Sequence, residues 1–108
     1  MKLPNGQQAL VDIRKIGDYC LSETHPRGKY RARVFRSVLG LTSAEAYELR
    51  AALTRAALEG EAHARESDEY GIRYSVDFEF ARAGRRGTVR SLWIVRAGVP
   101  RLTSCFVL

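Results

Sequence analysis

Apolar and polar side chains alternate strictly along one segment in the second half of the chain. Apolar residues occupy every even position from Ile72 to Phe80. The polar residues between them are Arg73, Ser75, Asp77 and Glu79. A period of two is the pattern of a half-buried β-strand. We therefore predict a strand over 72–80 whose Tyr74, Val76 and Phe78 face the core.

Two further strands are predicted after this one. Residues 88–95 form a nearly continuous apolar run, and residues 101–108 form a second run. The segment Gly84-Arg85-Arg86-Gly87 predicts a hairpin loop, and residues 97–100 predict the next turn. A weaker edge strand is expected between residues 60 and 70, which would give a sheet of three to four strands.

The first half of the chain has the spacing of helices. Helices are predicted over residues 12–21, from near Pro26 to residue 39, and from residue 42 to 59. The third has the clearest start, because Thr42-Ser43-Ala44-Glu45 reads as a capping box. Helices followed by a β-meander predict an α+β fold, with N-terminal helices packed on one face of a C-terminal antiparallel sheet. We expect a single domain over residues 1–108.

Some core residues follow from these patterns. Tyr30, Val34 and Val38 form the expected apolar stripe of the second helix. Trp93 is expected in the core as well. The cysteines, Cys20 and Cys105, match no metal-ligand spacing, so they are predicted to be two buried thiols.

Charge narrows the classes of partner. The 108 residues carry 18 Lys and Arg against 12 Asp and Glu, a net charge of +6, and 15 of the 18 cations are Arg. Arginine suits phosphate contacts and stacking on bases, so the positive charge indicates nucleic acid as partner, an acidic protein as partner, or simply solubility. No apolar run is long enough to span a membrane and the N-terminus lacks a signal-peptide pattern, so a soluble, cytoplasmic protein without a membrane partner is expected. Two histidines are too few for a histidine-built metal site, and no metal or cofactor is predicted.

The charge is distributed unevenly. Five cations and no acid lie between Arg27 and Arg36, whereas five acids and one Arg lie between Glu59 and Glu69. Residues 71–108 hold seven Arg against two acids. A basic helix and a basic sheet are thus expected on either side of an acidic connection.

Three motifs together resemble a known family. They are His25-Pro26-Arg27-Gly28-Lys29 running into Arg31-Ala32-Arg33-Val34-Phe35, Asp68-Glu69-Tyr70-Gly71 followed by Tyr74-Ser75-Val76-Asp77-Phe78, and Trp93-Ile94-Val95-Arg96 with residues 100–108. This combination resembles a small bacterial family known mainly as a domain of unknown function. Its modules occur alone and as C-terminal pieces of polymorphic toxins and phage-associated proteins, and the resemblance covers nearly the whole chain.

A looser resemblance is to the barnase–EndoU–colicin–RelE superfamily of small ribonucleases. The likeness lies in the order of elements and in a closing strand that carries Thr after a Pro-Arg turn. That superfamily combines N-terminal helices with a four-stranded antiparallel sheet. The resemblance implies ribonuclease chemistry as an expectation, because fold alone does not establish an activity.

The candidate catalytic residues are His25, Arg73 and Thr103. Metal-free RNA cleavage needs a group that moves protons and cations that stabilise the phosphorane. Imidazole titrates near working pH, and His25 precedes the basic helix; its alternative role is a cap or loop contact there. The catalytic reading requires His25 to share one cleft with Arg73, Arg90 and Thr103. The expected substrate-binding residues are Lys29, Arg31, Arg33, Tyr70, Arg90 and Arg101.

These observations predict a toxin-like domain with metal-independent ribonuclease activity. RNA is the expected substrate, and an acidic antitoxin or immunity protein is the expected inhibitor, because it would cover the arginine surface. The main alternative is a non-catalytic binding module, either antitoxin-like or an RNA-binding accessory domain. A plain interaction domain is the third interpretation.

Overall fold

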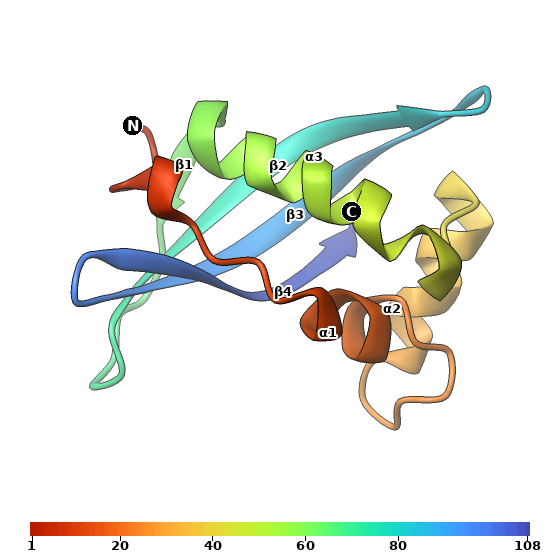
Figure 1. Ribbon diagram of the computed structural model, residues 1–108, viewed down its shortest axis with the longest axis horizontal. Coiled ribbons are helices and arrows are strands. Elements are labelled where there is room, and N and C mark those ends of the chain that lie inside the picture. The colour runs from red at the N-terminus through yellow and green to blue at the C-terminus, as the bar shows by residue number, and fades with distance from the viewer.

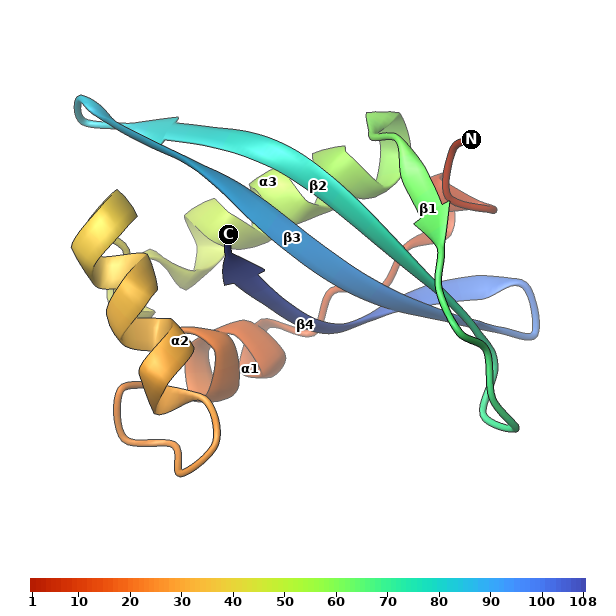
Figure 2. The ribbon, with the colours of Figure 1, turned by 180° about the vertical axis from the view of Figure 1, so that it is seen from behind.

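Four antiparallel strands form one sheet in the order of the chain. They are β1 (Ala62–Ala64), β2 (Ile72–Arg82), β3 (Arg85–Arg96) and β4 (Val99–Val107). The computed structural model describes all residues from Met1 to Leu108. One face of the sheet is covered by the long helix, α3 (Figure 1), and no helix lies in front of the other face (Figure 2). The predicted α+β architecture is confirmed.

The first and third helical segments begin at the caps that the sequence predicted, whereas the second begins at Lys29 and not near Pro26 as predicted. Asp12 accepts a 2.9 Å hydrogen bond from the backbone N–H of Arg14, ahead of α1 (Ile13–Lys15), which continues as a π-helical turn to Cys20. Thr42 and Glu45 form the predicted capping box before α3 (Ala46–Glu59). Between them lies α2 (Lys29–Val34), which continues as a π-helical turn over Phe35–Leu39. None of the helices has the length and hydrophobicity needed to cross a membrane.

The hairpin after β2 is tighter than its sequence predicts. The structure places only Ala83 and Gly84 between the strands, and Arg85 already pairs with Arg82 in the sheet. Ala83 and Gly84 both have positive φ angles, of 48° and 78°. Two residues with positive φ form the turn whose twist matches that of paired strands, so the predicted loop over 84–87 is mostly strand.

The predicted register of β2 is confirmed. Val76 is fully buried beneath the helices, and Tyr74 and Phe78 pack against the same core. Trp93 is also buried, as expected, and its indole N–H donates to the Ser91 hydroxyl at 2.8 Å. The Ser91 hydroxyl in turn donates to the Val76 carbonyl at 2.6 Å, so these polar atoms inside the core are satisfied.

The apolar stripe predicted for the second helix is wrong in part. Tyr30 is 63% exposed and Val34 is 42% exposed, whereas Ala32 and Phe35 are buried. A small residue explains the orientation: a side chain at Gly28 would stand 2.3 Å from the Tyr19 carbonyl oxygen. The helical segment therefore approaches its neighbours at Gly28 and Ala32, with Phe35 in the core, and the Tyr30 side chain remains in solvent.

The first residues of the chain protect an edge of the sheet. Leu10 pairs with Arg101 in parallel, donating to the Pro100 carbonyl at 2.9 Å and accepting from the Leu102 N–H at 3.1 Å.

The β3–β4 register shifts at the Leu92–Trp93 step, which leaves Thr103 as an extra residue on β4. An irregular strand of this kind re-aims its side chains locally.

The two cysteines lie inside the fold as free thiols. Cys20 is 2% exposed and Cys105 is 0% exposed, which confirms the prediction of buried thiols. Cys20 ends the first helical segment, and Cys105 lies on β4. The pKa of the Cys105 thiol is raised mainly by a hydrogen bond with Cys20 and, to a lesser degree, by burial.

Candidate functional site

The open face of the sheet carries three rows of side chains, and we call it the outer face. The strand register places Arg73, Ile94 and Arg101 in the first row, His63, Ser75, Leu92 and Ser104 in the second, and Asp77, Arg90 and Phe106 in the third. Neighbouring strands are about 4.8 Å apart, and successive rows on one face are about 7 Å apart. Groups of opposite charge, a histidine and a serine therefore meet on one open surface.

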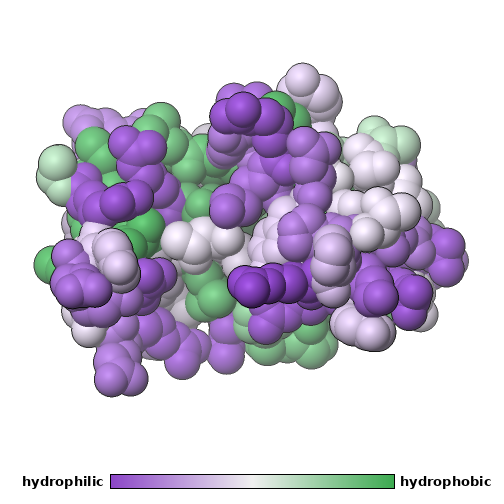
Figure 3. All heavy atoms as spheres, turned by 90° about the horizontal axis from the view of Figure 1, so that it is seen from below, coloured by the Kyte–Doolittle hydropathy of each residue, from purple (hydrophilic) through white to green (hydrophobic).

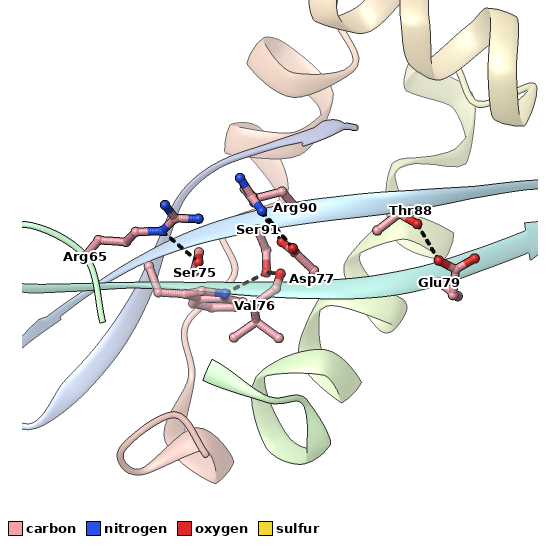
Figure 4. Close-up of polar contacts among 9 residues, drawn as sticks. Arg65, Ser75, Val76, Asp77, Glu79, Thr88, Arg90 and Ser91 are labelled. Atoms are coloured by element: carbon pink, nitrogen blue, oxygen red, sulfur yellow. Dashed lines mark hydrogen bonds and ion pairs between the residues drawn. The ribbon is translucent and has the colours of Figure 1, made fainter. Parts of the chain in front are cut away.

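Asp77 and Arg90 form a bidentate ion pair at the centre of the outer face. The Arg90 Nε and an Nη donate to the two carboxylate oxygens of Asp77 at 2.8 and 2.9 Å (Figure 4). The hydrogen bond from Arg90 lowers the pKa of the Asp77 carboxyl, and the same contact raises the pKa of the Arg90 guanidinium. Both groups stay ionised at neutral pH, and the guanidinium is held in a fixed orientation.

Arg65 approaches this pair from the chain that follows β1. Its Nε donates to the Ser75 hydroxyl oxygen at 2.8 Å, and its backbone N–H donates to the Arg73 carbonyl at 2.8 Å. The Ser75 side chain is almost fully buried, so the Arg65 contact fixes a guanidinium above the strand (Figure 4). Arg65 also lowers the pKa of Asp77 through its charge. One guanidinium group thus pairs with the carboxylate, and a second lies beside Ser75 in the neighbouring row.

His63 lies on the same face as these groups. It is the strand partner of Ser75, it is exposed, and its charge adds to the factors that lower the pKa of Asp77. An imidazole, two guanidinium groups and a carboxylate are therefore brought together by β1, β2 and β3. This cluster, made of His63, Arg65, Ser75, Asp77 and Arg90, is called the outer-face cluster below.

Neighbouring polar pairs border the outer-face cluster. Arg73 Nε donates to the Asp68 carboxylate at 2.8 Å, at the start of β2. The Thr88 hydroxyl donates to Glu79 at the other end (Figure 4). The predicted catalytic Arg73 thus lies on the outer face, and its guanidinium is already paired with an acid.

The structure does not place His25 with these arginines. The His25 Nδ1 accepts hydrogen bonds from the backbone N–H groups of Arg27 and Gly28 at 3.0 and 3.1 Å, within the turn that leads into α2. Its ring also meets Tyr19 edge-on, with 4.8 Å between the ring centroids. The loop that carries His25 lies beside α2, at the far end of the molecule from the turn before β2 that adjoins Arg73 (Figure 2). The single cleft required by the catalytic reading of His25 is not formed.

His25 instead lines an open hollow of about 630 Å³ between α1 and the following loop. The other residues of this hollow are Asp12, Arg14, Lys15, Tyr19 and Arg27. Arg14 donates hydrogen bonds to the Asp12 carboxylate. The unpaired positive charge of the hollow therefore comes from Lys15 and Arg27. Hydrophilic side chains dominate the side of the molecule that carries this loop and the β3–β4 turn (Figure 3).

Thr103 and Arg101 belong to a smaller hollow beside β4. Its volume is about 280 Å³, and it shares Asp12 and Lys15 with the hollow around His25. The Thr103 hydroxyl donates to the Leu92 carbonyl at 3.1 Å, so its proton is used in a hydrogen bond to the backbone at the irregular point of the sheet. Two of the three predicted catalytic residues, His25 and Thr103, therefore have backbone contacts that account for their positions.

The predicted binding residues on α2 divide into two groups. Lys29 and Arg33 each lie over the exposed Tyr30 ring, at 5.2 and 5.5 Å from its centroid. Arg31 lies over the Phe106 ring of the outer face instead, with its Cζ 4.1 Å from the centroid. Tyr70, in the connection before β2, is 59% exposed.

His63 and Arg65 were missed by the sequence interpretation, although a signal for them exists. Small apolar residues at 62 and 64 alternate with His63 and Arg65, which is a period of two. The acids that follow make this segment resemble a solvated connection. Pairing with β2 places His63 opposite Ser75, and Arg65 reaches the same serine, which only the paired structure reveals.

The outer-face cluster has the parts needed to act on a phosphate ester. Guanidinium groups stabilise charge on phosphate oxygens, and imidazole is the side chain most often used for proton transfer. The structure brings no group of three or more His, Cys, Asp or Glu side chains together in an arrangement that holds a metal ion. The chemistry that these residues themselves offer is proton transfer combined with electrostatic stabilisation.

Comparison with known proteins identifies the fold and the family. No curated protein matches the sequence. One chain of a solved contact-dependent growth inhibition toxin–immunity protein complex from Klebsiella pneumoniae 342 is similar in structure, with a TM-score of 0.69 and 18% sequence identity over 91% of this chain and 98% of that chain. This likeness shows a shared fold. Residues 2–108 match the domain of unknown function DUF6883, and the chain belongs to that family.

Proposed function

We propose that this protein is a toxin-type domain that cleaves RNA without a metal ion, at the outer-face cluster. The observation that carries the proposal is that exposed His63 lies opposite Ser75, which Arg65 contacts, one row from the Asp77–Arg90 pair, on a face that no helix covers. The fold shared with a chain of a toxin–immunity complex supports the toxin context. His63 replaces His25 as the acid–base residue of the sequence-based hypothesis.

The cleavage step follows from the chemistry of the three groups. His63 accepts the proton of a ribose 2′-hydroxyl, and the 2′-oxygen attacks the adjacent phosphorus. The bond between phosphorus and the 5′-oxygen breaks, and water protonates the leaving oxygen. Arg65 and Arg90 bind the phosphorane oxygens, because guanidinium donors held in place cost little reorganisation as charge develops. Asp77 orients Arg90 and does not contact the substrate.

An inhibitory partner is the second part of the proposal. A protein with an acidic surface would bind the outer face by the same charge attraction that draws RNA to it. Such a partner would occupy Arg90 and Arg65 together, and would block access to His63. This assigns the acidic immunity protein of the sequence-based hypothesis to a defined surface.

The test separates the two histidines. RNA cleavage by the purified protein is measured for wild type, His63→Gln and the matched control His25→Gln, with a chelator present throughout. We expect His63→Gln to abolish cleavage while His25→Gln retains it. Equal activity in the two variants, or no cleavage by wild type on any RNA, would overturn the ribonuclease proposal. Growth of cells that express each variant provides an independent readout.

A binding module is the second candidate function. The solved complex contains an immunity protein as well as a toxin, and the exposed cations around Tyr30 on α2 offer a binding surface without any acid–base group. Under this alternative, wild type expresses without harm and protects cells from a toxin encoded beside it. Growth arrest on expression of wild type alone contradicts it.

A further inference from the structure

An aromatic ring ends the third row of the outer face. Phe106 is the strand partner of Arg90, and Arg90 is the strand partner of Asp77. Phe106 is half-buried and does not belong to the main core cluster. The ring therefore lies about two strand spacings, or about 10 Å, from Asp77 across the open face.

Arg31 reaches this ring from α2. Its guanidinium carbon lies 4.1 Å from the ring centroid of Phe106, and the residue is exposed. Arg90 and Arg73 are each held by a carboxylate, at 2.8 Å. Arg31 has no ion-pair partner and no side-chain hydrogen bond, so its five N–H donors remain available.

This combination suits a planar, polar ligand. A guanidinium group stacked on an aromatic ring presents a flat face and unsatisfied donors at its edge. Nucleobases in single-stranded RNA stack on aromatic rings and on guanidinium planes and hydrogen-bond along their edges. A carboxylate of a protein partner would use the donors of Arg31 and would gain nothing from Phe106.

We propose that Arg31 and Phe106 form a nucleobase subsite beside the outer-face cluster. A single-stranded RNA segment places a base on Arg31 and Phe106, passes its phosphate over Arg90, and reaches His63 with the neighbouring nucleotide. The direction of the strand rests on the proposed function. Binding of the base itself does not, because it requires no cleavage.

Oligonucleotides that cannot be cleaved test the subsite apart from catalysis. A fluorescent 2′-deoxy hexanucleotide and an abasic chain of the same length and charge are titrated against the full protein, with anisotropy as the readout. We expect wild type to bind the base-bearing chain roughly tenfold more tightly, since stacking on a protein side chain contributes about that factor per base. Arg31→Ala and Arg31→Lys should both lose this preference, because lysine restores charge but not a planar face.

Matched variants separate stacking from charge. Arg33→Ala removes the same charge from the same helix but leaves the Arg31–Phe106 stack intact, because Arg33 lies over Tyr30. It should therefore weaken binding of both oligonucleotides equally. Phe106→Leu should lose the preference and Phe106→Tyr should keep it, with thermal unfolding used to confirm that each variant is folded.

Each other outcome overturns the subsite. If Arg31→Ala behaves like Arg33→Ala, the residue contributes charge only, while RNA cleavage that depends on His63 leaves the proposed function standing. If neither oligonucleotide binds and RNA is not cleaved, both proposals fail. If Arg31→Ala abolishes binding of the protein encoded beside this one and leaves oligonucleotide binding unchanged, Arg31 belongs to a protein interface.

Discussion

The outer face and the α2 helix carry similar numbers of cations but hold them differently. On the outer face, Arg73 and Arg90 each donate a hydrogen bond to a carboxylate, and Arg65 donates to a buried serine. On α2, Lys29 and Arg33 contact only an exposed aromatic ring. A held guanidinium loses little entropy on meeting a ligand, whereas a free one adds to the attraction felt at long range. We expect the first region to set the rate of the chemical step and the second to affect encounter.

The strongest test of this contrast is the substitution His63→Gln. General acid–base catalysis contributes about 10²- to 10⁴-fold, so we expect a loss of that size in the maximal rate. Affinity for an uncleavable RNA analogue should change little, because glutamine keeps the size and polarity of the side chain. The measurement is single-turnover cleavage at saturating protein. A loss confined to affinity would mean that His63 binds substrate and does not transfer protons.

Asp77→Asn is expected to have the next largest effect. The amide keeps the shape of the carboxylate but loses the charge that holds Arg90, so we expect roughly a tenfold slower cleavage step. The matched control is Asp18→Asn, which removes the charge of an exposed acid that lies away from the outer face. If the two variants cleave RNA at the same rate, orientation of Arg90 by Asp77 is unimportant.

The same pair predicts a pH dependence of stability. Arg90 lowers the pKa of the Asp77 carboxyl in the folded state below its unfolded value of about 3.9. The stabilisation is therefore fully present above that unfolded pKa and disappears as pH falls through the lowered one. The Asp77 side chain is 33% exposed, so solvent screens the pair and we expect about 1 kcal/mol or less. Urea unfolding of wild type and Asp77→Asn should differ at about pH 6 and converge at lower pH.

His25→Ala tests the opposite side of the comparison. The variant removes the acceptor for two backbone N–H groups in the turn that leads into α2, and loss of such hydrogen bonds costs about 1 kcal/mol. We expect the free energy of unfolding to fall by that amount while the cleavage rate stays unchanged. Asparagine offers a capping oxygen, so His25→Asn should recover part of the loss. A large drop in cleavage with normal stability would return His25 to the active site.

The smallest effect is expected from the double substitution Lys29→Ala and Arg33→Ala. Each phosphate contact contributes about 0.7 to the slope of log affinity against log salt for single strands, so the slope should fall by at most about twice that value. Cleavage at saturating RNA should not change. An unchanged slope would show that the α2 cations lie outside the path of RNA and leave them as a protein-binding surface.

The fold was predictable from local patterns, whereas the site depended on pairing between distant segments. The period of two over 72–80 and the caps at Asp12 and Thr42 are confirmed, because each rests on neighbours in sequence. The exposure of Tyr30 was not predictable from its stripe, since the close approach of Gly28 to the Tyr19 carbonyl orients α2. His63 and Arg65 lie on the outer face beside Ser75 only because β1 pairs with β2 in one register. A one-residue shift would turn both away from the outer face.

The two buried cysteines make the opening of this protein measurable. Cys20 lies on the segment after α1 and Cys105 on the last strand, so a reagent reaches them only when the N-terminal helices separate from β4. With excess reagent and fast labelling, the modification rate equals the opening rate; with slow labelling, it reports the fraction of molecules that are open. The labelling rate of the thiols thus measures the lifetime of the closed state, without any label added to the outer face.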